Sequence, residues 1–133
     1  MIIKKWKEGK MMRGYVYILI EKNGKTFKIG KALNFYKRNR NLNYNFNYEK
    51  SYLFEYDICD YASVEIILKH NFKGCSRKKR IKKNGSTEFF RIDCLDEVLS
   101  FLEVIRMKGK KVRINKEKII TRSNYKIDPE EYI

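Results

Sequence analysis

An Asn-Gly pair, Asn23-Gly24, lies between two stretches in which apolar and polar residues alternate. Asn-Gly in this setting is a strong signal for a β-hairpin, because a type I′ turn requires positive φ angles at both central residues. A two-residue loop at these positions places Lys22 opposite Lys25. Because each later pair follows from this one, the turn predicts the register of the whole hairpin.

The predicted register sorts the hairpin side chains onto two faces, since alternate residues of a strand point to opposite sides. One face is apolar and is expected to pack on the core; it carries Val16, Ile18, Ile20, Phe27 and Ile29. The other face carries Tyr15, Tyr17 and Lys28. Tyr17 faces Gly30, and Lys28 is a diagonal neighbour about 7–8 Å from Tyr17 at the backbone. Because Gly30 lacks a side chain, we expect an opening there that admits a phosphate group.

The tripeptides at 15–17 and 28–30, Tyr-Val-Tyr and Lys-Ile-Gly, resemble the two motifs of the GIY-YIG nuclease superfamily. The first motif of that family ends in a catalytic tyrosine, which Tyr17 matches, and the second ends in glycine, as here. Two positions depart from the usual pattern. Tyr15 stands in place of a glycine and Lys28 in place of a tyrosine. A subgroup common in phages and mobile elements carries Lys-Ile-Gly.

The resemblance extends to two further positions and covers about residues 14–92. In the family, an arginine about ten residues after the start of the second motif binds the scissile phosphate, and Arg38 stands there. Asn34 is a suitable N-cap for the helix that carries it. Glu65, on a second predicted helix, stands where the family has its single metal-binding carboxylate. The resemblance therefore implies a phosphodiester hydrolase with Mg²⁺ or Mn²⁺ as cofactor.

Each of these residues suits the reaction and also has an ordinary alternative. Tyr17 is the catalytic residue, or an ordinary strand tyrosine with a half-buried ring. An unperturbed phenol has a pKa of about 10 and is a weak base at neutral pH, but a nearby cation favours its phenolate. Lys28 supplies that cation, or is itself the base. Arg38 can bind two phosphate oxygens, or is a solvated surface residue. Glu65 binds the metal, or pairs with Lys69 at i+4 for a few tenths of a kcal/mol.

The net charge of +15 predicts a polyanionic partner, and DNA is expected, with RNA as an open alternative. Asn84 is either a phosphate ligand or part of an Asn-Gly turn. The expected nucleic-acid contacts combine positions near the motifs with a basic loop: Tyr15, Lys31, Arg40, Arg77, Lys78, Lys79, Arg80, Lys82, Lys83 and Asn84.

The pattern of the chain predicts an α/β (α+β) fold, a small, mostly antiparallel three-stranded sheet flanked by helices. Helix caps are expected at Asp60 and Asp93, and Gly109 is expected to end the last helix. The expected strands are 14–21, 25–30, 52–59 and a short strand at 87–92, and the helices are 34–43, 61–72 and one that begins after Asp93. The expected organisation is a basic N-terminal extension (1–13), a GIY-YIG-like nuclease domain (14–109) and a charged C-terminal extension (110–133).

Several functional classes lack support in the composition. His70 is the only histidine, so nucleases and phosphodiesterases that need two or more histidines do not fit. Three cysteines, Cys59, Cys75 and Cys94, show no CxxC spacing, and reduced thiols are expected. We find neither a signal peptide nor a long apolar run, so an intracellular, cytoplasmic protein without membrane contact is expected, acting in the host cell if a phage encodes it.

The sequence thus predicts a metal-dependent endonuclease that cuts DNA with weak preference for sequence or structure. The main alternative is a catalytically inactive nucleic-acid-binding or inhibitory protein on the same fold, and a third is an RNA-binding module. The oligomeric state is left open.

Overall fold

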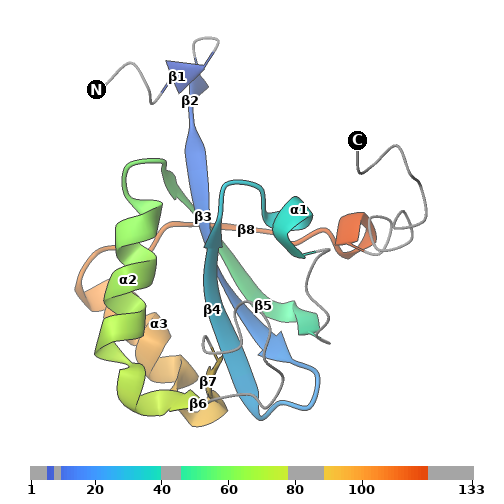
Figure 1. Cartoon of the computed structure of the whole chain (residues 1–133), viewed down its shortest axis with the longest axis vertical. Helices are drawn as coiled ribbons and strands as arrows, with labels where there is room; N and C mark the ends of the chain where they lie inside the picture. Colours follow the sequence, from blue (N-terminus) through green and yellow to red (C-terminus); the bar gives the residue numbers. More distant parts are fainter. Residues whose placement is uncertain (1–5, 8–9, 40–45, 78–88, 120–133) are drawn as a thin grey trace.

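The predicted hairpin forms the centre of a six-stranded antiparallel sheet in the computed structural model, which describes residues 6–7, 10–39, 46–77 and 89–119 (Figure 1). The strands lie in the order β6-β7-β4-β3-β5-β8, and β1 and β2 form a separate two-stranded sheet. The strands are β1 (Trp6–Lys7), β2 (Lys10–Met11), β3 (Arg13–Glu21), β4 (Thr26–Ala32), β5 (Phe46–Asp57), β6 (Ser76–Arg77), β7 (Phe89–Arg91) and β8 (Lys110–Val112). The helices are α1 (Phe35–Asn39), α2 (Tyr61–Asn71) and α3 (Leu95–Val104), with 3-10 helices η2 (Lys73–Cys75) and η3 (Ile92–Cys94).

The hairpin register is the predicted one, whereas the turn type is not. Tyr17 pairs with Gly30 between β3 and β4, as expected. The turn is closed by a 2.8 Å hydrogen bond from the Gly24 N–H to the Glu21 carbonyl. Gly24 has a φ of 71°, but Asn23 does not have a positive φ, so the turn is not type I′. The predicted register is kept with this different turn, in which Gly24 takes the positive φ.

The sheet is larger than the three strands predicted. β5 has 12 residues and pairs with β3 along most of its length. β7 lies within the short strand expected at 87–92, whereas β6 and β8 were not expected; all three have only two or three residues. Strands this short show almost no alternation in sequence, and they form where a neighbouring strand offers free backbone groups.

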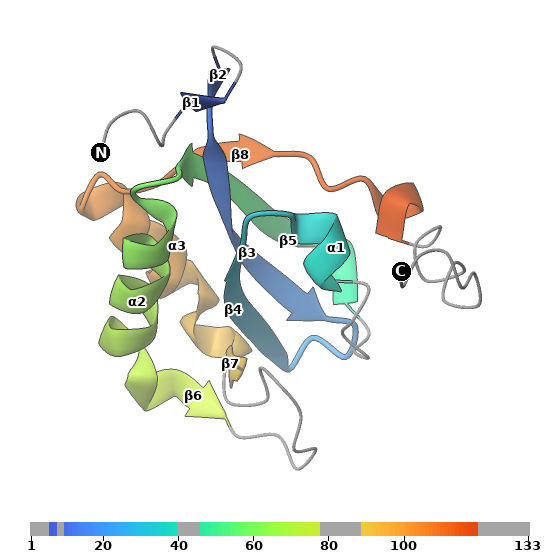
Figure 2. The same ribbon diagram turned by 45° about the horizontal axis from the view of Figure 1, so that its top comes forward.

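Both faces of the sheet are covered, which the hairpin pattern did not predict. On one face, side chains of β3, β4 and β5 pack with those of α2 and α3 around Val16, Phe54 and Leu68. On the other face, Tyr17 and Phe35 belong to a second buried cluster that includes residues of α1 and of the segment after β8. Figure 2 shows α2 and α3 on one side of the sheet and α1 on the other.

The helix ends follow the predictions in part. Asn34 caps α1 as expected, because its Oδ1 accepts a 3.1 Å hydrogen bond from the Lys37 N–H. Neither Asp60 nor Asp93 makes the predicted cap: α2 has no side-chain cap hydrogen bond at Asp60, and α3 is preceded by η3, with Cys94 at its N-cap. α3 also ends before Gly109, at Val104; Ile105 is its C-cap and is followed by Arg106 in the left-handed region, with a φ of 57°.

The cysteines also depart from the prediction. Cys75 and Cys94 form a disulfide that links η2 to η3, while Cys59 is free and exposed. The expectation of three reduced thiols was therefore wrong for two of them, because the fold brings together residues that are 19 apart in sequence. Among the described helices, none is both long and apolar enough to cross a membrane.

Candidate active site

A pocket of about 640 Å³ opens where β4 ends and α1 begins. Three residues predicted to be catalytic, Tyr17, Arg38 and Glu65, line this pocket together with Lys31, a predicted nucleic-acid contact. They come from β3, α1, α2 and β4 respectively. The remaining lining residues are Ala32, Leu33, Asn34 and Lys37.

The sheet topology explains how these residues meet. β7 pairs with β4 only at Thr26–Lys28, so within the described residues no strand borders the β4 edge near Gly30 and Ala32. Tyr17 reaches the pocket from the face that α1 covers, and Glu65 reaches it from α2 on the opposite face. Side chains from both faces therefore converge around one end of β4.

Tyr17 is fully buried, and its ring lies directly over Gly30. A Cβ atom built on Gly30 would overlap the phenol ring. The expected phosphate-sized opening is thus absent at this position, because the tyrosine itself fills the space. The ring also packs edge-on against Phe35, with 5.4 Å between ring centroids. Gly30 and Phe35 together hold the phenol at the inner side of the pocket.

Arg38 is placed by a very short helix. α1 has five residues and begins after Asn34, whose carbonyl accepts a 3.1 Å hydrogen bond from the Arg38 N–H. The Nε atom of Arg38 is buried, while the residue as a whole is partly exposed. This placement suits a guanidinium that faces an anion in the pocket.

Glu65 is buried on α2, with 6% of its surface exposed. Its Oε2 lies 2.7 Å from Nζ of Lys69, and its Oε1 lies 3.9 Å from Nζ of Lys31. The i+4 pair considered from the sequence therefore forms, but inside the pocket wall and not on the open surface. The Glu65 carboxylate therefore lies between two ammonium groups, one from its own helix and one from β4.

Lys28 lies apart from these residues. Its side chain is fully buried on the same face of the hairpin as Tyr17, and it does not line the pocket. Its Nζ lies 5.7 Å from the centroid of the Phe89 ring, a cation–π contact. Of the four residues predicted to be catalytic, Lys28 alone does not line the pocket.

The comparisons with known proteins assign the family. The profile of the T5orf172 domain matches residues 14–106, which include every residue that lines the pocket. The chain belongs to the T5orf172 domain family. This phage-associated domain is related to nuclease-like folds and indicates a protein that acts on DNA. No curated protein and no solved structure matches the chain.

The remaining predicted contacts of the T5orf172 domain are dispersed. Tyr15 lines a neighbouring pocket of about 260 Å³, and its hydroxyl donates a 3.1 Å hydrogen bond to Glu55. Burial and the Glu55 carboxylate raise the pKa of Tyr15. Arg77 is exposed on β6, at the sheet edge opposite β8. The other predicted contacts lie outside the described residues: Arg40, Lys78, Lys79, Arg80, Lys82, Lys83 and Asn84.

Sequence analysis of the T5orf172 domain missed two kinds of residue near the pocket. Lys37 lines it and adds a cation; its position beside Arg38 was the available signal. Tyr48 supports α1, since its hydroxyl donates a 3.2 Å hydrogen bond to Oδ1 of Asn39. Burial, with a smaller contribution from nearby Tyr17, raises the pKa of Tyr48 to about 12. The sequence around Tyr48 gave no sign of this contact.

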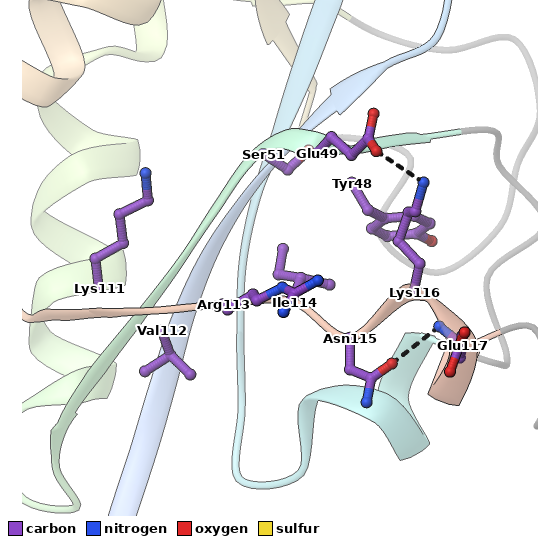
Figure 3. Close-up of a pocket in the computed structure, with 10 residues that line it drawn as sticks. All are labelled: Tyr48, Glu49, Ser51, Lys111, Val112, Arg113, Ile114, Asn115, Lys116 and Glu117. Carbon is purple, nitrogen blue, oxygen red and sulfur yellow. Dashed lines mark hydrogen bonds and ion pairs between the residues drawn. The ribbon is translucent and has the colours of Figure 1, made fainter.

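A larger pocket, of about 840 Å³, lies between β5 and the segment that follows β8 (Figure 3). Lys111 and Arg113 line it together with the acidic residues Glu49 and Glu117. It contains none of the residues predicted from the motifs. Its size alone therefore does not make it the reaction site, and the smaller pocket with the converging polar groups is the candidate.

Proposed function

We propose that this protein is a metal-dependent endonuclease that hydrolyses phosphodiester bonds in DNA, with a GIY-YIG-type site. The supporting observation is that Tyr17, Arg38 and Glu65, from three separate elements, line one pocket. A phenol, a guanidinium and a carboxylate supply a base, an anion clamp and a metal ligand. These are the three groups that hydrolysis of a phosphodiester requires.

In this proposal Arg38 binds the scissile phosphate. Its planar guanidinium donates to two non-bridging oxygens and stabilises the charge that grows on them in the transition state. Lys31 and Lys37, also at the pocket, increase the local attraction for a phosphate.

Tyr17 orients and deprotonates the attacking water. The tyrosine is assigned this role in preference to Lys28 because it lines the pocket and the lysine does not. Lys28 is buried on the same face of the hairpin as Tyr17 and has no direct role in this proposal.

The donor set fits Mg²⁺ or Mn²⁺ held jointly by the protein and its substrate. Among the described residues, no group of three or more His, Cys, Asp and Glu side chains could hold a metal ion. Magnesium often takes only one or two carboxylates from the protein and completes its shell with water and substrate phosphate, so Glu65 suffices as the protein ligand. When bound, the ion would act as a Lewis acid on the phosphate.

One observation favours a second candidate, an inactive nucleic-acid-binding protein. Glu65 is already neutralised by Lys69 at 2.7 Å, and an ion pair of this kind competes with metal binding. In this alternative, the cations of the pocket bind the DNA backbone and no bond is cut.

A nicking assay on supercoiled plasmid with added Mg²⁺ or Mn²⁺ distinguishes the two candidates. We expect the wild type to nick, and Glu65→Gln and Arg38→Ala to lower the rate by about 100- to 1,000-fold. Glu97→Gln, which removes an exposed carboxylate from α3, is the matched control and should nick like the wild type. A wild type that binds DNA but nicks with neither metal supports the inactive protein. Normal nicking by Glu65→Gln removes Glu65 from the site.

A further inference from the structure

The segment after β8, residues 113–119, is here called the C-terminal strap. It lies outside the range that matches the T5orf172 domain, yet it runs from β8 to the neighbourhood of α1 (Figures 1 and 2). Ile114 and Ile119 are buried, with 9% and 7% of their surfaces exposed. Both belong to the same cluster as Tyr17 and Phe35. The strap is therefore part of the core on the face of the sheet that α1 covers.

Tyr36 of α1 makes two contacts with the strap. The Asn115 N–H donates a 2.8 Å hydrogen bond to the Tyr36 hydroxyl oxygen. Nζ of Lys118 lies 4.8 Å from the centroid of the same ring. The strap therefore contacts both the hydroxyl group and the ring face of Tyr36.

The strap is itself held in place by two sets of contacts. Oδ1 of Asn115 accepts hydrogen bonds from the N–H groups of Glu117 and Lys118, at 3.0 and 3.3 Å. Lys116 pairs with Glu49 of β5 at 3.1 Å, and Figure 3 shows this pair bridging the strap and the strand. Tyr36 is therefore bound by an ordered segment.

The position of Tyr36 on α1 means that its contacts with the strap affect the orientation of the helix. A helix turns by about 100° per residue, so Phe35 and Asn39 share one stripe while Tyr36 and Arg38 flank that stripe on opposite sides. Phe35 packs on Tyr17, and Asn39 accepts from Tyr48, so these contacts fix only the buried stripe. A contact at Tyr36 opposes rotation of the helix about that stripe, and the same rotation moves Arg38.

A helix of five residues has little stability of its own, so its orientation depends on such contacts. A rotation of about 10° moves an atom about 6 Å from the axis by about 1 Å. A displacement of that size at a reacting group can cost up to about 100-fold in rate.

We propose that the C-terminal strap is a positioning element that holds α1 through Tyr36 and thereby orients Arg38 toward the pocket. Tyr36 and Asn115 are positioning residues in this scheme, because they act through Arg38. The catalytic part of this inference rests on the proposed nuclease function. The mechanical part, the hold on α1, does not.

The mechanical part is tested by hydrogen exchange on the full-length Tyr36→Phe protein. This change deletes the acceptor oxygen and keeps the ring that packs on Phe35. The matched control is Tyr56→Phe, which deletes a hydroxyl that donates a 2.7 Å hydrogen bond to the Met107 carbonyl, away from α1. We expect the Arg38 amide to exchange about 5-fold faster in Tyr36→Phe and at the wild-type rate in Tyr56→Phe. Unchanged exchange in Tyr36→Phe overturns the proposal.

The catalytic part is tested by kinetics of DNA nicking. Tyr36→Phe should lower kcat by about 10-fold or more with KM within about 2-fold, because Arg38 acts mainly in the transition state. In an Arg38→Ala background the same change should have no further effect, since the residue it positions is gone. Additive losses in the double variant overturn the positioning role. If the wild type does not nick at all, the proposed function fails, and the exchange result alone decides whether the strap holds α1.

Discussion

Replacement of Gly30 by alanine tests whether the Tyr17 ring occupies the space above β4. In the structure, an added Cβ at Gly30 meets the ring atoms and hydroxyl of Tyr17. The phenol cannot easily retreat, because it is fully buried and packs on Phe35. Either β4 shifts away from the ring or the ring leaves its present position, and both alternatives disturb the pocket.

The expected cost follows from overpacking of a close-packed core, about 1–3 kcal/mol in the free energy of unfolding. For a chain of this size, that corresponds to a fall in melting temperature of about 4–12 °C. If the hydroxyl of Tyr17 moves by about 1 Å, the rate of the proposed cleavage falls by up to about 100-fold.

Thermal unfolding and plasmid nicking of Gly30→Ala measure the two effects, with Gly74→Ala as the control. Gly74 is exposed in η2, and a Cβ there meets nothing within 4 Å, so its replacement should leave both properties unchanged or raise stability slightly. If Gly30→Ala melts and nicks like the wild type, the ring does not lie over Gly30 and the account of the pocket is wrong.

Three further predictions concern stability. The pKa of Tyr48 is raised to about 12 from the ordinary 10, so the folded state favours the neutral phenol. The resulting contribution to the free energy of unfolding is complete below about pH 10 and is lost as the pH rises toward 12. The unfolding free energy should therefore fall across that range less steeply in Tyr48→Phe than in the wild type, and equal slopes would contradict the assignment. Reduction of the Cys75–Cys94 disulfide should lower stability by about 2–4 kcal/mol, measured by denaturant unfolding with and without reductant, whereas Cys59→Ser should have no effect. Arg106→Gly should raise the melting temperature by an amount corresponding to about 1 kcal/mol, because a φ of 57° is strained for arginine and not for glycine. A lower melting temperature would show that contacts of the arginine side chain outweigh the backbone strain.

The sequence predicted the hairpin register and the position of α2 because both follow from local patterns. Alternation and the Asn-Gly pair determine which residues face each other, and helical spacing with its flanking residues places α2 at Tyr61–Asn71. Glu65 was expected to bind a metal or to pair with Lys69, and the structure places it at the pocket with Lys69 2.7 Å away.

The sequence did not predict the surroundings of Lys28 and Gly30. The pattern put Lys28 beside Tyr17 on the correct face, but it could not show that Phe89 covers that lysine. The pairing of β7 with β4 depends on three residues that are distant in sequence. The space above Gly30 also depends on the orientation of the Tyr17 ring, which packing with Phe35 determines.

By itself, the sequence determined which side chains the hairpin presents together and which residue types were available for phosphate and metal. Only the tertiary structure decided that side chains from both faces of the sheet meet at one end of β4. It also decided that Lys28 is buried against Phe89 and that residues beyond the matched domain contact α1. The physical reason is that strand alternation and helix periodicity are local properties of the chain. Contacts between distant segments instead determine how strands of two or three residues pair at the sheet edges. Such contacts also determine the orientation of a five-residue helix.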